Sequence, residues 1–315
     1  MSDGSGEGGS YDVAVVGGGI AALSAALFAA GSGLRTIVVS EIVMGGELIN
    51  LEEVVRFPGI TDPISGSELA GRVEVQAVEA GAEFVFDDVT EIARDGADGG
   101  AFVVRGLETD IRTRTVVAAM GAGRRRLGLD GESDLEGRGV SFCGTCDGPF
   151  FKERSVAVVG DHEFAGRESL VVARYASAVT LITRRGEPDL SAGTRSAIDG
   201  NDRIRVLPHT EVAALAGSGG VLGAVQVRDV ETGGVSDLDL AGLFVNDGLE
   251  PRSSLLRGLV ELAPDGRVPV DAGMRTSVDG LFAVGELRSG FPGWAVAAAG
   301  DGAAAAASAQ QRVRS

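Results

Sequence analysis

The chain has 315 residues, 44% of them hydrophobic and 23% charged, and its 45 acidic and 28 basic side chains give a net charge of −17. This composition is typical of a folded protein of about two domains and excludes a disordered chain. A surface this acidic repels phosphate, which excludes nucleic acid and anionic membranes as favoured partners. The polar start MSDGSGEGGS lacks the pattern of a secretion signal, and no run of about 18 apolar residues is present to span a bilayer. We expect a cytoplasmic protein with a flexible tail over residues 1–10.

The first predicted element is a strand that runs into the glycine-rich turn VVGGGIAA and a helix. Gly17 can make the tight turn, Gly19 lets the backbone approach a pyrophosphate, and Ala22 keeps the helix close to the sheet. Glu41 ends the second strand, where a carboxylate can accept hydrogen bonds from a ribose hydroxyl. The pattern predicts a βαβ unit that binds a dinucleotide at the helix N-terminus. The alternative is a glycine-rich turn in another kind of α/β protein.

Two later strands mark the predicted domain boundaries. Residues 115–122 (TVVAAMGA) and 242–248 (GLFVNDG) each indicate a strand that runs into a turn of small residues, where the chain crosses between domains. We therefore expect a discontinuous outer domain over 11–122 and 246–315, with an inner domain inserted over 123–245. The inner segment holds 14 basic and 18 acidic residues, a net of −4, so most of the excess acid lies in the outer domain.

The only two cysteines, Cys143 and Cys146, are separated by two residues. In a cytoplasmic protein this spacing indicates a redox pair or half of a zinc site. A structural zinc ion takes four ligands, and the other candidates, His162 and His209, do not have finger-like spacing, so we predict no metal. Asp147 follows the pair and can either carry a proton for the thiols or cap a helix.

A second copy of the βαβ pattern begins at SVAVVGDHEFAG. In both copies the second strand ends 23 positions after the first glycine of the turn. Gly160 and Ala165 keep the first and third positions, but His162 occupies the second, where a side chain obstructs a pyrophosphate. Arg184 and Arg185 follow the second strand in place of an acid, a change that suits a 2′-phosphate and so NADPH. The copy therefore predicts either an altered NADPH site or a unit that retains the fold without the ligand.

Near the end of the chain, TSVDGLFAVGELRSG predicts a strand that ends at Gly285, with Glu286 directly after it. An alanine-rich helix is predicted from Trp294 onward. The N-terminus of this helix can face the negative end of a cofactor, or the helix can serve packing alone.

These segments together resemble the low-molecular-weight thioredoxin reductases. The resemblance runs from about Tyr11 to Gln310 and rests on VVGGGIAA, MGGELINLEEVVRFPGI, LEGRGVSFCGTCDGPFF, AGLFV, TSVDGLFAVGE and AAGDGAAAA, in that order. It implies an α/β fold of two nested Rossmann-like dinucleotide-binding domains with three-layer ββα architecture. It also implies FAD in the outer domain, the CxxC on the inner domain, and a homodimer.

The resemblance assigns FAD contacts to several of the residues above. Gly17, Gly19 and Glu41 would hold the FAD diphosphate and the adenosine ribose, while Gly285 and Glu286 would contact the flavin side of the molecule. Glu286 stands where the family has Asp.

Two further residues receive roles by the same resemblance. Gly46 and Glu47 lie in the segment similar to the family's GGQL, with Glu47 in place of Gln. Trp294 does not match the family, but its place at the start of the last predicted helix favours a role in covering the flavin, although a sole tryptophan can equally belong to the core.

The resemblance also assigns the thiol chemistry. Cys143 and Cys146 match the redox-active pair, and Asp147 matches the acid that moves protons to and from the dithiol.

Three departures from the family fall on the nicotinamide nucleotide or its approach. His162 replaces a glycine, Asp189 replaces the last arginine of the HRRxxxR segment, and Gly293-Trp294 replaces Arg-Gln near the flavin. An acid at position 189 repels a 2′-phosphate. We therefore predict a degenerate NADPH site and a non-standard electron donor.

Three functions follow from these predictions. The favoured one is a thioredoxin-reductase-like flavoprotein that reduces thioredoxin or a similar small dithiol protein with electrons from ferredoxin or a reduced flavin, or that runs in reverse as a dithiol oxidase. The second is an ordinary NADPH-dependent thioredoxin reductase. The third is a non-catalytic flavin sensor, against which the intact CxxC followed by Asp argues.

Overall fold

The computed structural model of the chain describes residues 10–41, 43–54, 56–96 and 100–315. These residues fall into two compact units: unit 1 contains the chain up to Gly123 together with Pro251–Ser315, and unit 2 is Arg124–Glu250. The chain passes between the units at β7 (Ala122–Arg124) and β16 (Leu249–Pro251), two short strands that pair with each other. Of the tail predicted over residues 1–10, only Ser10 lies within the described residues.

Unit 1 is built on a sheet with the strand order β3-β2-β1-β6-β5-β4, in which β17 also pairs with β6. The pairs β1–β2, β2–β3, β1–β6 and β6–β17 are parallel, whereas β4–β5 and β5–β6 are antiparallel. The strands are β1 (Tyr11–Val16), β2 (Thr36–Ser40), β3 (Glu83–Phe86), β4 (Glu91–Arg94), β5 (Phe102–Arg105), β6 (Asp110–Ala118) and β17 (Leu281–Ala283).

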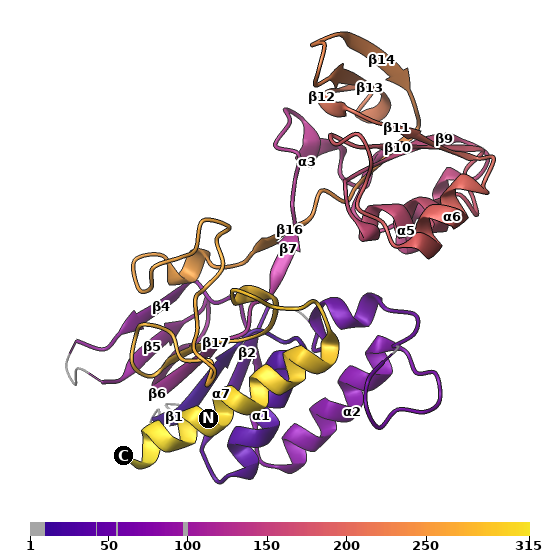
Figure 1. Ribbon diagram of the computed structural model, residues 1–315. Helices are drawn as coiled ribbons and strands as arrows, with labels where there is room; N and C mark the ends of the chain where they lie inside the picture. The colour runs from indigo at the N-terminus through magenta and orange to yellow at the C-terminus, as the bar shows by residue number, and fades with distance from the viewer. Residues whose placement is uncertain (1–9, 42, 55, 97–99) are drawn as a thin grey trace, which may run out of the picture. The chain divides into compact units, whose positions relative to one another are not determined.

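Alternation along the strands sends side chains to two separate cores. Val13 and Val15 of β1 pack among the helices on one face, and Ala14 and Val16 pack on the other face against β4, β5 and the segment around Leu256. The helices of the first face run alongside one another (Figure 1). The helical segments of unit 1 are α1 (Ile20–Gly31), α2 (Gly66–Glu79), α7 (Ala295–Arg314) and the short η1 (Gly46–Asn50), η3 (Ser254–Leu256) and η4 (Gly285–Leu287).

The C-terminal helix α7 begins at Ala295, which confirms the helix predicted from Trp294. It packs on α1 through small residues, among them the buried Ala305. At Gly302 a Cβ atom would lie only 2.7 Å from the backbone nitrogen of Ala25, so only glycine permits this approach of the two helices.

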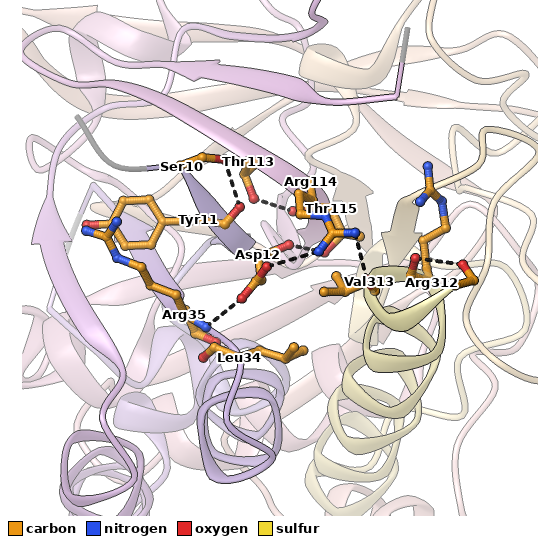
Figure 2. A network of polar contacts seen from close by, with 12 residues as sticks. Ser10, Tyr11, Asp12, Leu34, Arg35, Thr113, Arg114, Thr115, Arg312 and Val313 are labelled. Carbon is orange, nitrogen blue, oxygen red and sulfur yellow. Dashed lines mark hydrogen bonds and ion pairs between the residues drawn. The ribbon is translucent and has the colours of Figure 1, made fainter. Parts of the chain in front are cut away.

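A polar network ties the end of α7 to the start of the sheet (Figure 2). The Asp12 carboxylate accepts a hydrogen bond from the Arg35 N–H at 3.0 Å and forms an ion pair of 3.5 Å with Arg114. Arg114 in turn donates to the carbonyl oxygen of Val313 at 2.6 Å, and the Thr115 hydroxyl donates to the Asp12 carbonyl at 2.7 Å. The network therefore joins the start of β1, the chain before β2, strand β6 and the last turn of α7.

Unit 2 repeats the same plan. Its main sheet has the order β11-β10-β9-β15-β8, and every pair in it is parallel, while β12, β13 and β14 form a separate antiparallel sheet. The elements are α3 (Glu132–Leu135), β8 (Val140–Ser141), α4 (Gly144–Asp147), η2 (Gly148–Phe151), β9 (Ser155–Val159), α5 (Glu163–Val172), β10 (Ala178–Ile182), α6 (Ala192–Asp199), β11 (Ile204–Leu207), β12 (Thr210–Ser218), β13 (Val221–Asp229), β14 (Val235–Asp239) and β15 (Gly242–Val245).

Unit 2 also has three layers. Val156 and Val158 of β9 pack against α5 and α6, whereas Ala157 and Val159 pack against β12–β14 (Figure 1). The predicted internal repeat is confirmed, because β1-α1-β2 and β9-α5-β10 are two βαβ units of the same topology. The predicted α/β fold of two nested Rossmann-like units is likewise confirmed.

Candidate functional site

The glycine turn between β1 and α1 forms a cradle at the helix N-terminus. Gly17 has φ = +116°, and a Cβ atom there would lie 2.6 Å from the carbonyl carbon of Ala119, so this glycine is required by the protein's own backbone. Gly19, the N-cap residue of α1, has an ordinary φ of −72°, and no atom lies within 4 Å of the place a Cβ would occupy. Ala22 is fully buried in the core. The space beside Gly19 is therefore open to a ligand.

The segment that leads into η1 lies against this turn. The Gly45 N–H donates to the Gly18 carbonyl at 2.7 Å, and a Cβ on Gly46 would lie 3.0 Å from the Gly19 Cα. Glu47 follows on η1 and accepts a hydrogen bond of 3.4 Å from the Asn50 amide. The structure thus places Gly46 against Gly19 of the cradle, with Glu47 directly after it on η1.

The segment that follows β17 forms a further side of the cradle. Gly285 has φ = +68°, its N–H donates to the Asp301 carboxylate of α7 at 3.1 Å, and a Cβ there would lie 3.2 Å from the Ala21 Cβ. Burial raises the pKa of Glu286, Arg267 at 3.4 Å opposes this shift, and the nearby Glu47 carboxylate adds to it. Both acidic departures from the family, Glu47 and Glu286, therefore lie within electrostatic reach of each other.

Glu41 directly follows β2, as predicted, and its carboxylate is half exposed. It forms an ion pair of 2.7 Å with Arg252, a residue 211 positions later in the chain. An incoming ribose would therefore find the Glu41 carboxylate already oriented by this arginine.

Trp294 is the N-cap residue of α7 and is 46% exposed. The guanidinium of Arg56 lies 5.5 Å from the centre of its ring, within the range of a cation–π contact. The exposure excludes the interpretation of Trp294 as a core residue.

The Cys143–Cys146 pair forms a disulfide at the start of α4, with 5.4 Å between the Cα atoms. Cys143 is the N-cap residue, and its sulfur accepts a hydrogen bond from the Cys146 N–H at 3.2 Å. Cys146 is exposed, whereas Cys143 is half-buried. The N–H of one cysteine of the pair is thus directed at the sulfur of the other.

Asp147 points to a serine and not to a helix end. Its carboxylate accepts a hydrogen bond from the Ser141 hydroxyl at 2.7 Å, and Ser141 accepts one from the Cys143 N–H at 3.1 Å. Asp147 precedes η2, yet its side chain makes no capping hydrogen bond. Asp147 therefore occupies the N-cap position of η2, one of the two roles expected for it, while its carboxylate accepts from Ser141 and not from the helix.

A buried carboxyl group lies beneath the CxxC loop. Glu168 of α5 is 7% exposed, and its Oε1 accepts a hydrogen bond from the N–H of Gly144, between the two cysteines. Burial raises the pKa of Glu168, and the Gly144 N–H and the charge of Arg124 oppose this shift. Glu168 therefore holds the loop that presents the disulfide.

The corresponding glycine turn of unit 2 has a different surface. Gly160 has φ = +152°, and a Cβ there would lie 2.9 Å from the carbonyl carbon of Asn246, so it is required for packing as Gly17 is. Ala165 is fully buried, and His162 is exposed at the N-cap position of α5. The backbone of His162 bridges that of Asp189.

A carboxylate lies in the first turn of α5, directly after this glycine turn. Glu163 accepts hydrogen bonds from the Ser191 N–H at 2.7 Å and the Thr194 hydroxyl at 2.7 Å. Burial would raise the pKa of Glu163, but these bonds and one from Arg167 outweigh it and lower the pKa to about 2. Glu163 is therefore held ionised in this turn, where it forms an ion pair of 2.8 Å with Arg167.

The two arginines after β10 are both exposed. Arg184 lies 3.6 Å from Glu211 and 3.7 Å from Asp247, so its charge is largely compensated. The Arg185 N–H donates to the Asp161 carboxylate at 3.1 Å, which ties the end of β10 to the turn after β9.

Sequence reasoning missed Arg252, Ser141 and Glu168. Ser141 carried a weak local signal, since its hydroxyl lies two residues before the first cysteine. Arg252 and Glu168 carried none, because their partners lie 211 and 24 positions away.

Two findings concern metals and membranes. Across the described ranges, no group of three or more His, Cys, Asp or Glu side chains is placed to hold a metal ion. In the same part of the chain, every helix is too short or too polar to cross a membrane.

Comparison with known proteins gives one consistent result. Residues 11–302 match the pyridine nucleotide-disulphide oxidoreductase family. The chain is 39% identical over 302 residues to a thioredoxin reductase of Mycolicibacterium smegmatis, with 96% of each chain covered, and 33% identical over 309 residues to one of Peptoclostridium litorale, with 96% and 97% covered. The crystal structure of Lactococcus lactis thioredoxin reductase superposes with a TM-score of 0.89 at 29% identity, covering 97% of this chain and 99% of that one. The predicted resemblance is confirmed, and the chain belongs to the pyridine nucleotide-disulphide oxidoreductase family as a disulfide oxidoreductase related to the thioredoxin reductases.

Proposed function

We propose that the protein is an FAD-dependent thiol-disulfide oxidoreductase that passes electrons through Cys143 and Cys146 to the disulfide of a small dithiol protein such as thioredoxin. The observation that carries this function is the CxxC disulfide with its exposed Cys146, borne on a unit distinct from the open glycine cradle. The names of the relatives supply the class of partner. A homodimer is proposed from the same relationship, and light scattering of the purified protein tests it.

The cradle in unit 1 fits the adenine dinucleotide of FAD. Gly19 leaves room for a pyrophosphate at the N-terminus of α1, and Glu41 offers a carboxylate to a ribose at the end of β2. Glu286 and Trp294 would border the flavin end. When bound, FAD supplies the exchange of two electrons between a donor and a disulfide.

The thiol pair then transfers these electrons by disulfide exchange. One thiolate of the reduced pair attacks a sulfur of the partner disulfide, the mixed disulfide forms, and the second thiolate displaces the partner's sulfur. Cys143–Cys146 is thereby oxidised by two electrons, and the partner disulfide gains two electrons and two protons. Asp147, linked through Ser141 to the Cys143 N–H, is placed to hold a proton beside the pair.

We further propose that the electron donor is not NADPH but a donor such as ferredoxin or a reduced flavin. The support lies in the residues of the second glycine turn: the side chain of His162 occupies the position of the approach glycine, and the turn that would receive a pyrophosphate carries the acidic residues Asp161 and Glu163. The backbone of Asp189 pairs with that of His162, so a third acidic residue lies next to this turn. Arg184, which would attract a 2′-phosphate, is compensated by two acids. An ordinary NADPH-dependent reductase is the alternative, and a dithiol oxidase uses the same groups in reverse.

An anaerobic titration of the purified yellow protein separates these donors. We expect the flavin band to remain unchanged with NADPH and to bleach with dithionite. Rapid bleaching by NADPH would instead support the alternative function, an ordinary NADPH-dependent reductase. The variant His162→Gly should bind NADPH more tightly if the side chain is the obstacle, and an unchanged affinity would show that it is not.

A further inference from the structure

The amino ends of β9, β10 and β11 lie along one edge of the unit 2 sheet, because these strands are parallel and adjacent. The turns that precede the strands are hydrogen-bonded to one another: the Ser177 N–H donates to the Arg154 carbonyl, and the Val179 N–H donates to the Arg203 carbonyl. The chain after α5 reaches the same edge. Four exposed cations from three separate segments gather here, and we call them the basic edge: Lys152, Arg154, Arg174 and Arg203.

The basic edge is uncompensated in an otherwise acidic protein. Among the described residues none of its four cations forms an ion pair, whereas other arginines of unit 2, such as Arg228, are paired with acids. Three of the four cations and Glu153 line a hollow of about 360 Å³. The acids adjacent in sequence to these cations are Glu153 and Asp202, so the four cations remain in excess over them in a chain of net charge −17. Such a patch attracts an acidic surface within about 8 Å at physiological ionic strength.

The basic edge lies close to the CxxC. Tyr175 lines the hollow, and its ring lies against Gly148, where a Cβ would be 3.0 Å from the ring. From Cys146 to Lys152 the chain advances six helical residues, which is about 9 to 12 Å. A typical protein interface covers about 800 Å² on each partner, a patch about 30 Å across. One partner can therefore cover both the exposed Cys146 and the basic edge.

We propose that the basic edge is a docking surface for an acidic face of the dithiol protein that Cys143 and Cys146 reduce. This inference rests on the proposed function and adds the chemistry by which the partner is recognised. The excess acid of the whole chain repels an acidic partner, and the basic edge provides local attraction that orients the partner's disulfide toward Cys146. Charges at such a rim act mainly on the association rate and on its dependence on salt.

The test is a single-turnover reaction of the flavin-loaded full chain, reduced beforehand with dithionite so that no physiological donor is needed. Oxidised thioredoxin of acidic net charge is the probe, and its reduction is followed at several ionic strengths up to about 1 M, where the Debye length falls to about 3 Å. The variants are Lys152→Glu, Arg174→Glu and their combination, with Arg257→Glu of unit 1 as the charge-matched control. The uncharged bis(2-hydroxyethyl) disulfide serves as a second substrate.

We expect the double variant to reduce the thioredoxin about tenfold more slowly than the wild type at low salt, and the two rates to converge near 1 M. Arg257→Glu should retain the wild-type rate, and the small disulfide should react equally with every variant. Equal thioredoxin rates at low salt would overturn the docking surface. If the wild type reduced neither disulfide, the proposed function itself would fail.

The milder pair Lys152→Gln and Arg174→Gln guards against a folding defect. Each should give a smaller decrease in rate than the corresponding glutamate, with unchanged circular dichroism and flavin content. A decrease of the same size for Gln and Glu would contradict an electrostatic origin.

Discussion

Two glycines of the same turn should respond to alanine in opposite ways, although both belong to the predicted nucleotide motif. In Gly17→Ala the new Cβ would lie 2.6 Å from the Ala119 carbonyl carbon, against the roughly 3.5 Å of an ordinary contact, and φ = +116° is unfavourable for alanine. Backbone strain of about 1–3 kcal/mol and overpacking of about 1–3 kcal/mol predict a loss of about 2–6 kcal/mol in the free energy of unfolding of unit 1.

Gly19→Ala meets neither obstacle. Its φ of −72° suits alanine, and no protein atom lies within 4 Å of the new methyl group. A glycine replaced by alanine without strain leaves stability unchanged or raises it by up to about 1 kcal/mol, through the unfolded chain. The methyl group instead occupies the approach of a pyrophosphate, so we expect FAD to bind at least about tenfold more weakly, a loss of about 1.4 kcal/mol.

Urea unfolding of the flavin-free protein, followed by circular dichroism, measures the first effect, and fluorescence titration with FAD measures the second. The reasoning is refuted if flavin-free Gly19→Ala is destabilised as much as Gly17→Ala, or if Gly19→Ala binds FAD as tightly as the wild type does.

Three other changes have expected results. Because burial raises the folded-state pKa of Glu168 above its ordinary value of 4.5, the free energy of unfolding falls as the pH rises from 4.5 through the raised pKa. Glu168→Gln keeps an acceptor for the Gly144 N–H and should make the free energy of unfolding less dependent on pH over that range. Glu168→Ala should lower the free energy of unfolding by about 1–3 kcal/mol. The pKa of Glu163 is lowered to about 2, so its stabilisation of the folded state is present above about pH 4.5 and is lost between pH 4.5 and pH 2. Glu163→Gln should therefore lose less stability than the wild type over that range of pH. An acid unfolding curve equal to that of the wild type would contradict the hydrogen bonds of Glu163. Serine in place of Cys143 or Cys146 should abolish disulfide turnover while the purified protein stays yellow, and a colourless variant would show that thiol and flavin roles are not separate.

The features that could be predicted from the sequence are those that depend on short segments of it. The turn at Gly17, the helix after it and the strand that ends before Glu41 follow from local spacing, and the second copy repeats that spacing at Gly160. Such patterns can be recognised in a sequence because each element depends on one turn and on the regular spacing of its buried residues.

Strand boundaries depended on packing that the sequence did not reveal. Residues 115–122 are predicted as a strand that runs into a turn, and the strand ends at Ala118 but begins earlier than predicted, at Asp110. Its first half alternates exposed and buried positions where it pairs antiparallel with β5, and its second half is buried on both faces between parallel strands. The hydrophobic run marked only the second half, and the residues after Ala118 form the turn against Gly17.

The contacts that shape the candidate site are mostly long-range. Arg252 reaches Glu41, Glu168 reaches Gly144, and the basic edge gathers cations that are scattered through unit 2. The sequence alone does not reveal which of these side chains lie together, because only the order of strands in the sheet brings them into contact.

The interrupted layout of unit 1 has a consequence for synthesis on the ribosome. Unit 2 is one continuous segment and can fold once residue 250 has emerged, but the β6 edge and the apolar side of α1 stay uncovered until β17 and α7 follow. At about 5–20 residues per second, the 65 residues from 251 to 315 require roughly 3–13 s. During that interval unit 2 with its CxxC is complete while unit 1 still lacks β17 and α7, so the FAD site proposed for unit 1, which includes Gly285 and Glu286, is completed last.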